Sequence, residues 1–250
     1  MKRYVKFFFA AMLCLCISQN EVQGQGLKGV FNKVKGAVTD VAGKIGGKNS
    51  KATEAEPSNG PAKATVTDVK NSISDIRAYT GLREADFAAK MKSKGFVEGI
   101  NDIGLDGTVY KSKTGGYYLA VKYGTRGKDS FVRQITKATY TTKPNFVALK
   151  TSFLDLAKQS TDLKTKLASA SIQIKGKIFN KVNAKNPTDR VSKFLPAFDN
   201  FVNNKEEGNV FERYTENDYD YCMSYSYLKI NTSVIITVII VDKTIESQEG

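Results

Sequence analysis

The residues with the most distinctive chemistry in this 250-residue chain are tyrosines spaced two apart near its end. Within Tyr219–Tyr227, a strand would place Tyr219, Tyr221, Tyr225 and Tyr227 on one face and small residues on the other, because strand side chains alternate. Tyrosine rings combine apolar area with a polar tip, which suits contacts with protein or sugar. The same spacing also fits a face packed beneath helices. Both interpretations therefore stay open for these tyrosines.

Two neighbouring motifs resemble known sites but depart from them. Three carboxylates alternate in Glu216–Asp220, yet an EF-hand needs glycine at its sixth position and glutamate at its twelfth, where this chain has Tyr221 and Tyr227. Ser226 and Lys229 match the S-x-x-K pattern of acyl enzymes, but a strand sends these side chains to opposite faces. We therefore expect no metal, cofactor or acyl-enzyme site here.

The chain contains no histidine. This excludes Ser-His-Asp and Cys-His catalytic units, histidine-ligated zinc and imidazole proton transfer. Glycine loops that bind phosphate are also missing from the sequence. Carboxylates and lysines remain as catalytic groups, so a carboxylate-based envelope hydrolase is one alternative to the non-catalytic protein that we expect.

Residues 1–24 predict export. A basic start precedes the apolar run Phe7–Ile17, which is too short to span a bilayer, and small residues follow, as in a secretory signal with cleavage after residue 24. We expect a bacterial protein of the periplasm, the outer membrane or the exterior. Cys14 and Cys16 follow leucines instead of the small residue that usually precedes a lipidated cysteine, so a lipid anchor is the less favoured alternative.

Residues 25–46, the heptad segment, repeat an aliphatic first residue and a glycine third. On a helix, lysines would surround one apolar stripe: Leu27, Phe31, Val34, Val38, Val41 and Ile45. Each glycine costs about 1 kcal/mol relative to alanine in a helix interior, which predicts a poor helix alone and a better one against a partner. The alternatives are an anionic membrane surface, a protein surface including this chain's own domain, or a poorly ordered arm. Residues 47–64 have the composition of a flexible linker.

The folded part should begin at residue 65, and its apolar spacing changes twice from helical to strand period. The first unit, 65–143, contains two helices, at 66–76 and 80–95, and three strands: Thr108–Ser112, Tyr117–Tyr123 and Ser130–Thr141. The second, 144–245, contains a helix from Phe146, a short helix with Leu163 and Leu167, a helix from Asn186 that Pro196 kinks or delays, and three strands: Val210–Thr215, Tyr219–Ile230 and Ser233–Asp242. We expect a disordered tail at 246–250.

This order predicts an α+β fold in which helices pack on one face of one or two antiparallel sheets, arranged as two helix-then-three-strand units in tandem. Such tandem units resemble in architecture the secreted bacterial modules with the β-lactamase-inhibitor-protein-like fold. The strand Val234–Val241 is apolar on both faces and too short to cross a membrane as a helix. It predicts a central strand covered on both sides or a self-association contact.

The net charge of +13 is unevenly distributed, because residues 25–205 carry +17 and residues 206–250 carry −6. A basic surface attracts acidic polysaccharide, anionic lipid or nucleic acid. Nucleic acid is the least favoured because helix-turn-helix and RNP signatures are missing. We expect an exported, non-catalytic binding protein whose α+β domain engages a protein or envelope component, with the heptad segment as a tether. A polyanion-binding protein is the second alternative.

Overall fold

The computed structural model describes residues 72–114, 116–174 and 180–247. The predicted signal, the heptad segment with its six apolar residues, the linker and most of the predicted tail lie outside these residues. None of the helices in the described part of the chain is long and apolar enough to cross a membrane.

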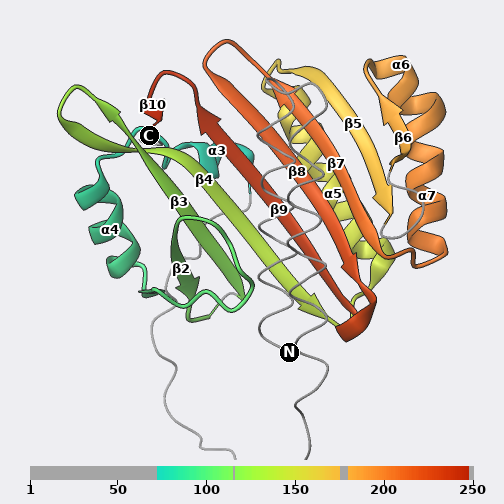
Figure 1. Ribbon diagram of the computed structural model, residues 1–250, viewed down its shortest axis with the longest axis horizontal. Coiled ribbons are helices and arrows are strands. Elements are labelled where there is room, and N and C mark those ends of the chain that lie inside the picture. Colours follow the sequence, from blue (N-terminus) through green and yellow to red (C-terminus); the bar gives the residue numbers. More distant parts are fainter. Residues whose placement is uncertain (1–71, 115, 175–179, 248–250) are drawn as a thin grey trace, which may run out of the picture. The chain divides into compact units, whose positions relative to one another are not determined.

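One antiparallel sheet runs through the molecule in the strand order β1-β2-β3-β4-β9-β8-β7-β5-β6, with β10 beside β3 (Figure 1). Its strands are β1 (Phe96–Glu98), β2 (Thr108–Ser112), β3 (Tyr117–Arg126), β4 (Asp129–Thr142), β5 (Lys166–Ile174), β6 (Asn180–Ala184), β7 (Gly208–Thr215), β8 (Tyr219–Leu228), β9 (Ser233–Asp242) and β10 (Glu246–Ser247). Together with the helices, this confirms the α+β fold with an antiparallel sheet.

The helical elements are α3 (Ile73–Arg77), α4 (Glu84–Ser93), α5 (Phe146–Asp162), α6 (Pro187–Asp189), the π-helical η2 (Arg190–Phe194), α7 (Leu195–Asn203) and the 3-10 turn η3 (Lys229–Asn231). Those of the first half precede its strands, whereas in the second half β5 and β6 lie between α5 and α6, and η3 lies between β8 and β9. Asn145 caps α5 and Asn186 caps α6, each accepting a backbone N–H from three residues ahead. Pro196 falls in the first turn of α7, where a proline is tolerated.

The two halves join through their last strands. β4 pairs with β9 from Gln134 opposite Val241 to Thr142 opposite Ser233, so the strands of the first half continue into those of the second. The halves hold four and five strands instead of three each. The sequence pattern did not predict β1, β5, β6 or β10, and β10 lies in the segment that was expected to be a disordered tail.

The predicted short helix with Leu163 and Leu167 is wrong. Lys164 adopts a left-handed conformation (φ 62°) just after α5, and Lys166–Ile174 then form β5, paired with β7. A left-handed residue commonly ends a helix. Since Ala170 and Ile172 alternate with partly exposed polar residues and enter the core, the segment fits a strand better than a helix.

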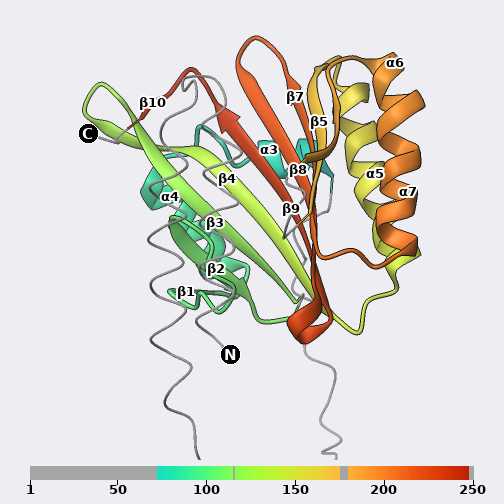
Figure 2. The same ribbon diagram turned by 45° about the vertical axis from the view of Figure 1, so that its right-hand side comes forward.

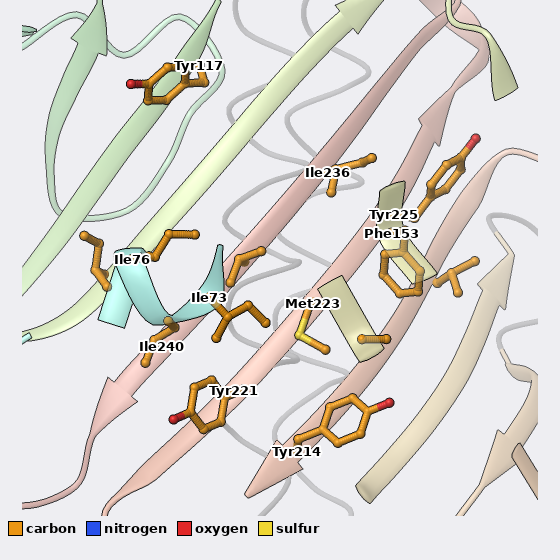
Figure 3. Close-up of a cluster of buried hydrophobic side chains, with 14 of the residues drawn as sticks. Ile73, Ile76, Tyr117, Phe153, Tyr214, Tyr221, Met223, Tyr225, Ile236 and Ile240 are labelled. Carbon is orange, nitrogen blue, oxygen red and sulfur yellow. The ribbon is translucent and has the colours of Figure 1, made fainter. Parts of the chain in front are cut away.

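All the described helices lie on one face of the sheet in both views (Figures 1 and 2). Phe153 from α5 and Phe198 from α7 pack edge to face with ring centroids 5.4 Å apart, and both rings contact Tyr225 of β8. Aromatic pairs with this geometry stabilise a core beyond the area they bury. This aromatic cluster joins the helices to the second half of the sheet, and Figure 3 shows two of its members, Phe153 and Tyr225.

β9 is the central strand that its sequence predicts, since it lies between β4 and β8. Ile236 and Ile240 face the helices, and Ile235 and Ile239 on the other face are only 1% and 3% exposed. Both faces of β9 are therefore removed from water.

Candidate functional site

The four predicted tyrosines lie on the face of β8 that packs against the helices. Tyr221, Tyr225 and Tyr227 are 1%, 0% and 6% exposed, and Tyr219 is half-buried. Figure 3 shows Tyr221 and Tyr225 among the buried side chains. The rings of Phe146 and Tyr227 lie 5.0 Å apart. Packing beneath helices, one of the two interpretations of the sequence, describes Tyr221, Tyr225 and Tyr227.

The carboxylates of Glu216–Asp220 are partly engaged by neighbouring side chains. Glu216 accepts hydrogen bonds from Arg77 (2.9 Å) and from the hydroxyl of Tyr221. Asp220 accepts one from Thr215 (2.6 Å), and Arg77 also lies over the ring of Tyr219. No cluster of three or more metal-ligating side chains occurs in the described residues.

The two carboxylates that are buried in the described part of the chain, Glu212 and Asp242, have structural partners. Glu212, fully buried, accepts hydrogen bonds from Arg190 at 2.6 and 3.3 Å and from the Tyr214 hydroxyl at 3.1 Å. Burial raises the pKa of Glu212 above its ordinary value, although Arg190 opposes this. Asp242 accepts from the backbone and hydroxyl of Thr244, at 2.9 and 2.6 Å. The contacts of Glu212 attach η2 to the sheet, and those of Asp242 stabilise the turn that follows β9.

Lysines lie in the connections at both ends of the sheet, but one end carries more of them and fewer acidic residues. Antiparallel pairing brings the α4–β1, β2–β3, β4–α5, α7–β7 and β8–β9 connections to this end, along the lower edge of Figure 1. Each connection carries one lysine: Lys94, Lys113, Lys143, Lys205 and Lys229. Lys94 is partly exposed and the other four are exposed. Within the described residues, none of the five forms a salt bridge. We call this surface the lysine end.

Two exposed apolar side chains accompany these lysines. Ile230 of η3 is 73% exposed, and Val147 in the first turn of α5 is 66% exposed. Isolated exposed apolar residues are common on protein surfaces. Here, however, Ile230 lies in the β8–β9 connection and Val147 directly follows the β4–α5 connection. These two connections are neighbours at the lysine end, because the backbone N–H of Lys143 donates to the carbonyl of Thr232 (3.3 Å).

The connections at the lysine end are held in fixed conformations. The Asn231 side chain donates to the Tyr140 hydroxyl (3.1 Å), and the Lys205 ammonium lies 5.5 Å from the Phe146 ring centroid. Non-glycine residues with positive φ are uncommon and concentrate where tertiary contacts or function require them. Three of the four in the described chain lie here: Lys143, Lys205 and Thr232.

Acidic residues are few at the lysine end and more frequent at the opposite end. Glu206 and Glu207 share the α7–β7 connection with Lys205. At the opposite end, the β1–β2 connection carries Asp102 and Asp106, and the β7–β8 turn carries Glu216 and Asp218. The two ends of the sheet therefore differ in charge.

Sequence reasoning located the basic excess of residues 25–205 but missed this surface. Its five lysines are separated by up to 135 positions, from Lys94 to Lys229, and no spacing rule links them. The only sequence signal for this surface was the presence of lysines in turn segments. The strand order was needed to show that these turns lie at the same end of the sheet. Ile230 was expected within a strand, whereas β8 ends at Leu228 and leaves Ile230 in the turn.

Comparison with known proteins gives no relative: no family model, curated protein or solved structure matches this chain.

Proposed function

We propose that this protein is an exported, non-catalytic binding protein that engages an anionic component of the bacterial envelope through its lysine end. The observation that carries the proposal is the charge of the lysine end. Its five connections carry five lysines and two glutamates, whereas the β1–β2, β3–β4, α5–β5, β6–α6, β7–β8 and β9–β10 connections at the opposite end carry four lysines and four carboxylates. Lysine ammonium groups attract anionic surfaces without requiring the bidentate geometry of arginine.

The pairing of the buried carboxylates Glu212 and Asp242 favours binding over catalysis. Glu212 is held by Arg190, and Asp242 by Thr244 and by Arg126 at 3.5 Å. A carboxylate-based hydrolase uses two carboxyl groups that face one substrate. These two carboxyls instead face side chains that link elements of the fold, which is the arrangement of a structural ion pair or turn.

The experiment compares two charge-reversal variants of the full mature chain for sedimentation with envelope membranes. The first is Lys143→Glu/Lys205→Glu/Lys229→Glu at the lysine end. The matched control is Lys128→Glu/Lys164→Glu/Lys185→Glu, three exposed lysines in connections at the opposite end. Both variants change the net charge by the same amount and retain the basic heptad segment.

We expect the first variant to lose at least about tenfold in apparent affinity, because each surface lysine near an anionic membrane contributes about 1 kcal/mol. The control should stay within about threefold of the wild type. Equal losses in both variants would show that only net charge matters, and unchanged binding of the first variant would remove the lysine end as the contact surface.

A further inference from the structure

We propose that the partner of the lysine end is an anionic lipid bilayer, into which Ile230 and Val147 insert while the surrounding lysines contact the headgroups. This inference rests on the proposed function and adds the class of partner. It commits to lipid because an acidic polysaccharide or nucleic acid would be recognised by the lysines alone.

The first argument is the combination of charge and apolar exposure. Ile230 follows Lys229 directly, and Val147 lies four residues after Lys143. Interfacial segments place apolar side chains below the headgroup level and keep lysine ammonium groups at it. Both pairs meet this requirement, since each joins one exposed lysine to one exposed apolar side chain.

The second argument is the shape of the contact. The connections follow the end of the sheet from β1 to β7, which spans about 30 Å at the usual spacing between strands. A row of single lysines over this width matches a surface that presents many dispersed negative charges. A compact anionic ligand would instead need several cations around one point.

The third argument is the fixed backbone of the two inserting segments. The Lys143–Thr232 backbone hydrogen bond links them, and the contact of Asn231 with Tyr140 holds η3 against β4. A segment that is already ordered loses less conformational entropy when it binds. Ile230 is therefore presented on a turn that need not fold during insertion.

Trp fluorescence tests insertion directly, because the natural sequence contains no tryptophan. We would introduce Ile230→Trp in the full mature chain and titrate it with phosphatidylcholine vesicles containing 30% phosphatidylglycerol, with pure phosphatidylcholine vesicles, and with heparin. Val191→Trp is the matched control, because Val191 is 63% exposed on η2, away from the lysine end.

We expect a blue shift of the emission of Ile230→Trp with the anionic vesicles only, and no shift for Val191→Trp. In the otherwise natural chain, Val147→Ser/Ile230→Ser should lower the partition coefficient about tenfold, whereas Val191→Ser should leave it within twofold. Circular dichroism checks that the variants fold.

Two results would overturn the lipid inference. One is vesicle binding without a blue shift at position 230 and without an effect of the serine variants, which would indicate a purely electrostatic contact. The other is strong heparin binding without vesicle binding, which would indicate a polyanion partner. Neither result would contradict the proposed function. The proposed function is contradicted only if charge reversal at the lysine end has no specific effect on envelope binding.

Discussion

At the scale of single residues, stability depends on the ion pair between the fully buried Glu212 and the partly buried Arg190. Glu212 is fully buried, and its carboxylate contacts Arg190 and Tyr214. Removing one partner of a buried pair leaves an uncompensated charge, which is far more costly than losing an exposed pair.

We expect Arg190→Leu to destabilise the protein by about 3–5 kcal/mol near pH 8, measured by urea unfolding. The native carboxyl of Glu212 has a raised pKa, so the folded state binds its proton more readily than the unfolded state and stability falls as the pH rises through that interval. Without Arg190 the pKa of Glu212 should rise further, and the loss should be smaller at pH 5 than at pH 8.

The control for this prediction is Arg83→Leu, since Arg83 and Asp129 form an exposed pair at 3.3 Å. This variant should change stability by less than about 1 kcal/mol at either pH. The double variant Arg190→Leu/Glu212→Gln should recover part of the loss. A loss in Arg190→Leu that is independent of pH would contradict the role assigned to Glu212.

At the scale of elements, apolar spacing predicted the secondary structure well where only one period fitted the whole segment. β3, β4, β8 and β9 were predicted close to their observed bounds because alternation and turn residues agreed. β5 was missed because Leu163 and Leu167 also fit a helical spacing. Lys164 adopts the left-handed conformation that follows α5, a position usually taken by glycine or asparagine. A lysine there did not indicate in advance that the helix ends.

Gly107 shows how a single position controls the entry to a strand. It has φ +97°, and a Cβ atom there would lie 2.3 Å from the carbonyl oxygen of Val121 on β3. Gly127 also has positive φ, but a Cβ there would meet nothing within 4 Å. A comparison of substitutions at the two glycines therefore separates the cost of the left-handed conformation from the cost of the close contact with Val121.

We expect Gly127→Ala to lower the free energy of unfolding by about 1 kcal/mol, from its left-handed conformation alone. Gly107→Ala should lower it by roughly 3 kcal/mol, because the same cost is joined by displacement of β2 from β3. Chemical denaturation of both variants measures the difference. Equal losses would mean that the approach of Val121 contributes nothing.

At the scale of the whole molecule, the strand order distributes the charge unevenly, so that the two ends of the sheet differ in charge. The sequence predicted helices on one face of an antiparallel sheet, and alternation in Tyr219–Tyr227 predicted which residues share a face. It did not predict the lysine end, because that surface depends on the pairing of β4 with β9 and on where each strand ends. Local sequence patterns therefore predicted individual elements, whereas the candidate site could be identified only from the way these elements are arranged.

Hydrogen–deuterium exchange of the full chain, with and without anionic envelope membranes, tests the central claim most directly. The account predicts slower exchange on binding in the backbone of 143–147, 204–207 and 229–232, which carry Lys143, Lys205 and Lys229. Slower exchange at 99–107 and 216–218 instead, or no change at the lysine end while the protein is bound, would contradict it.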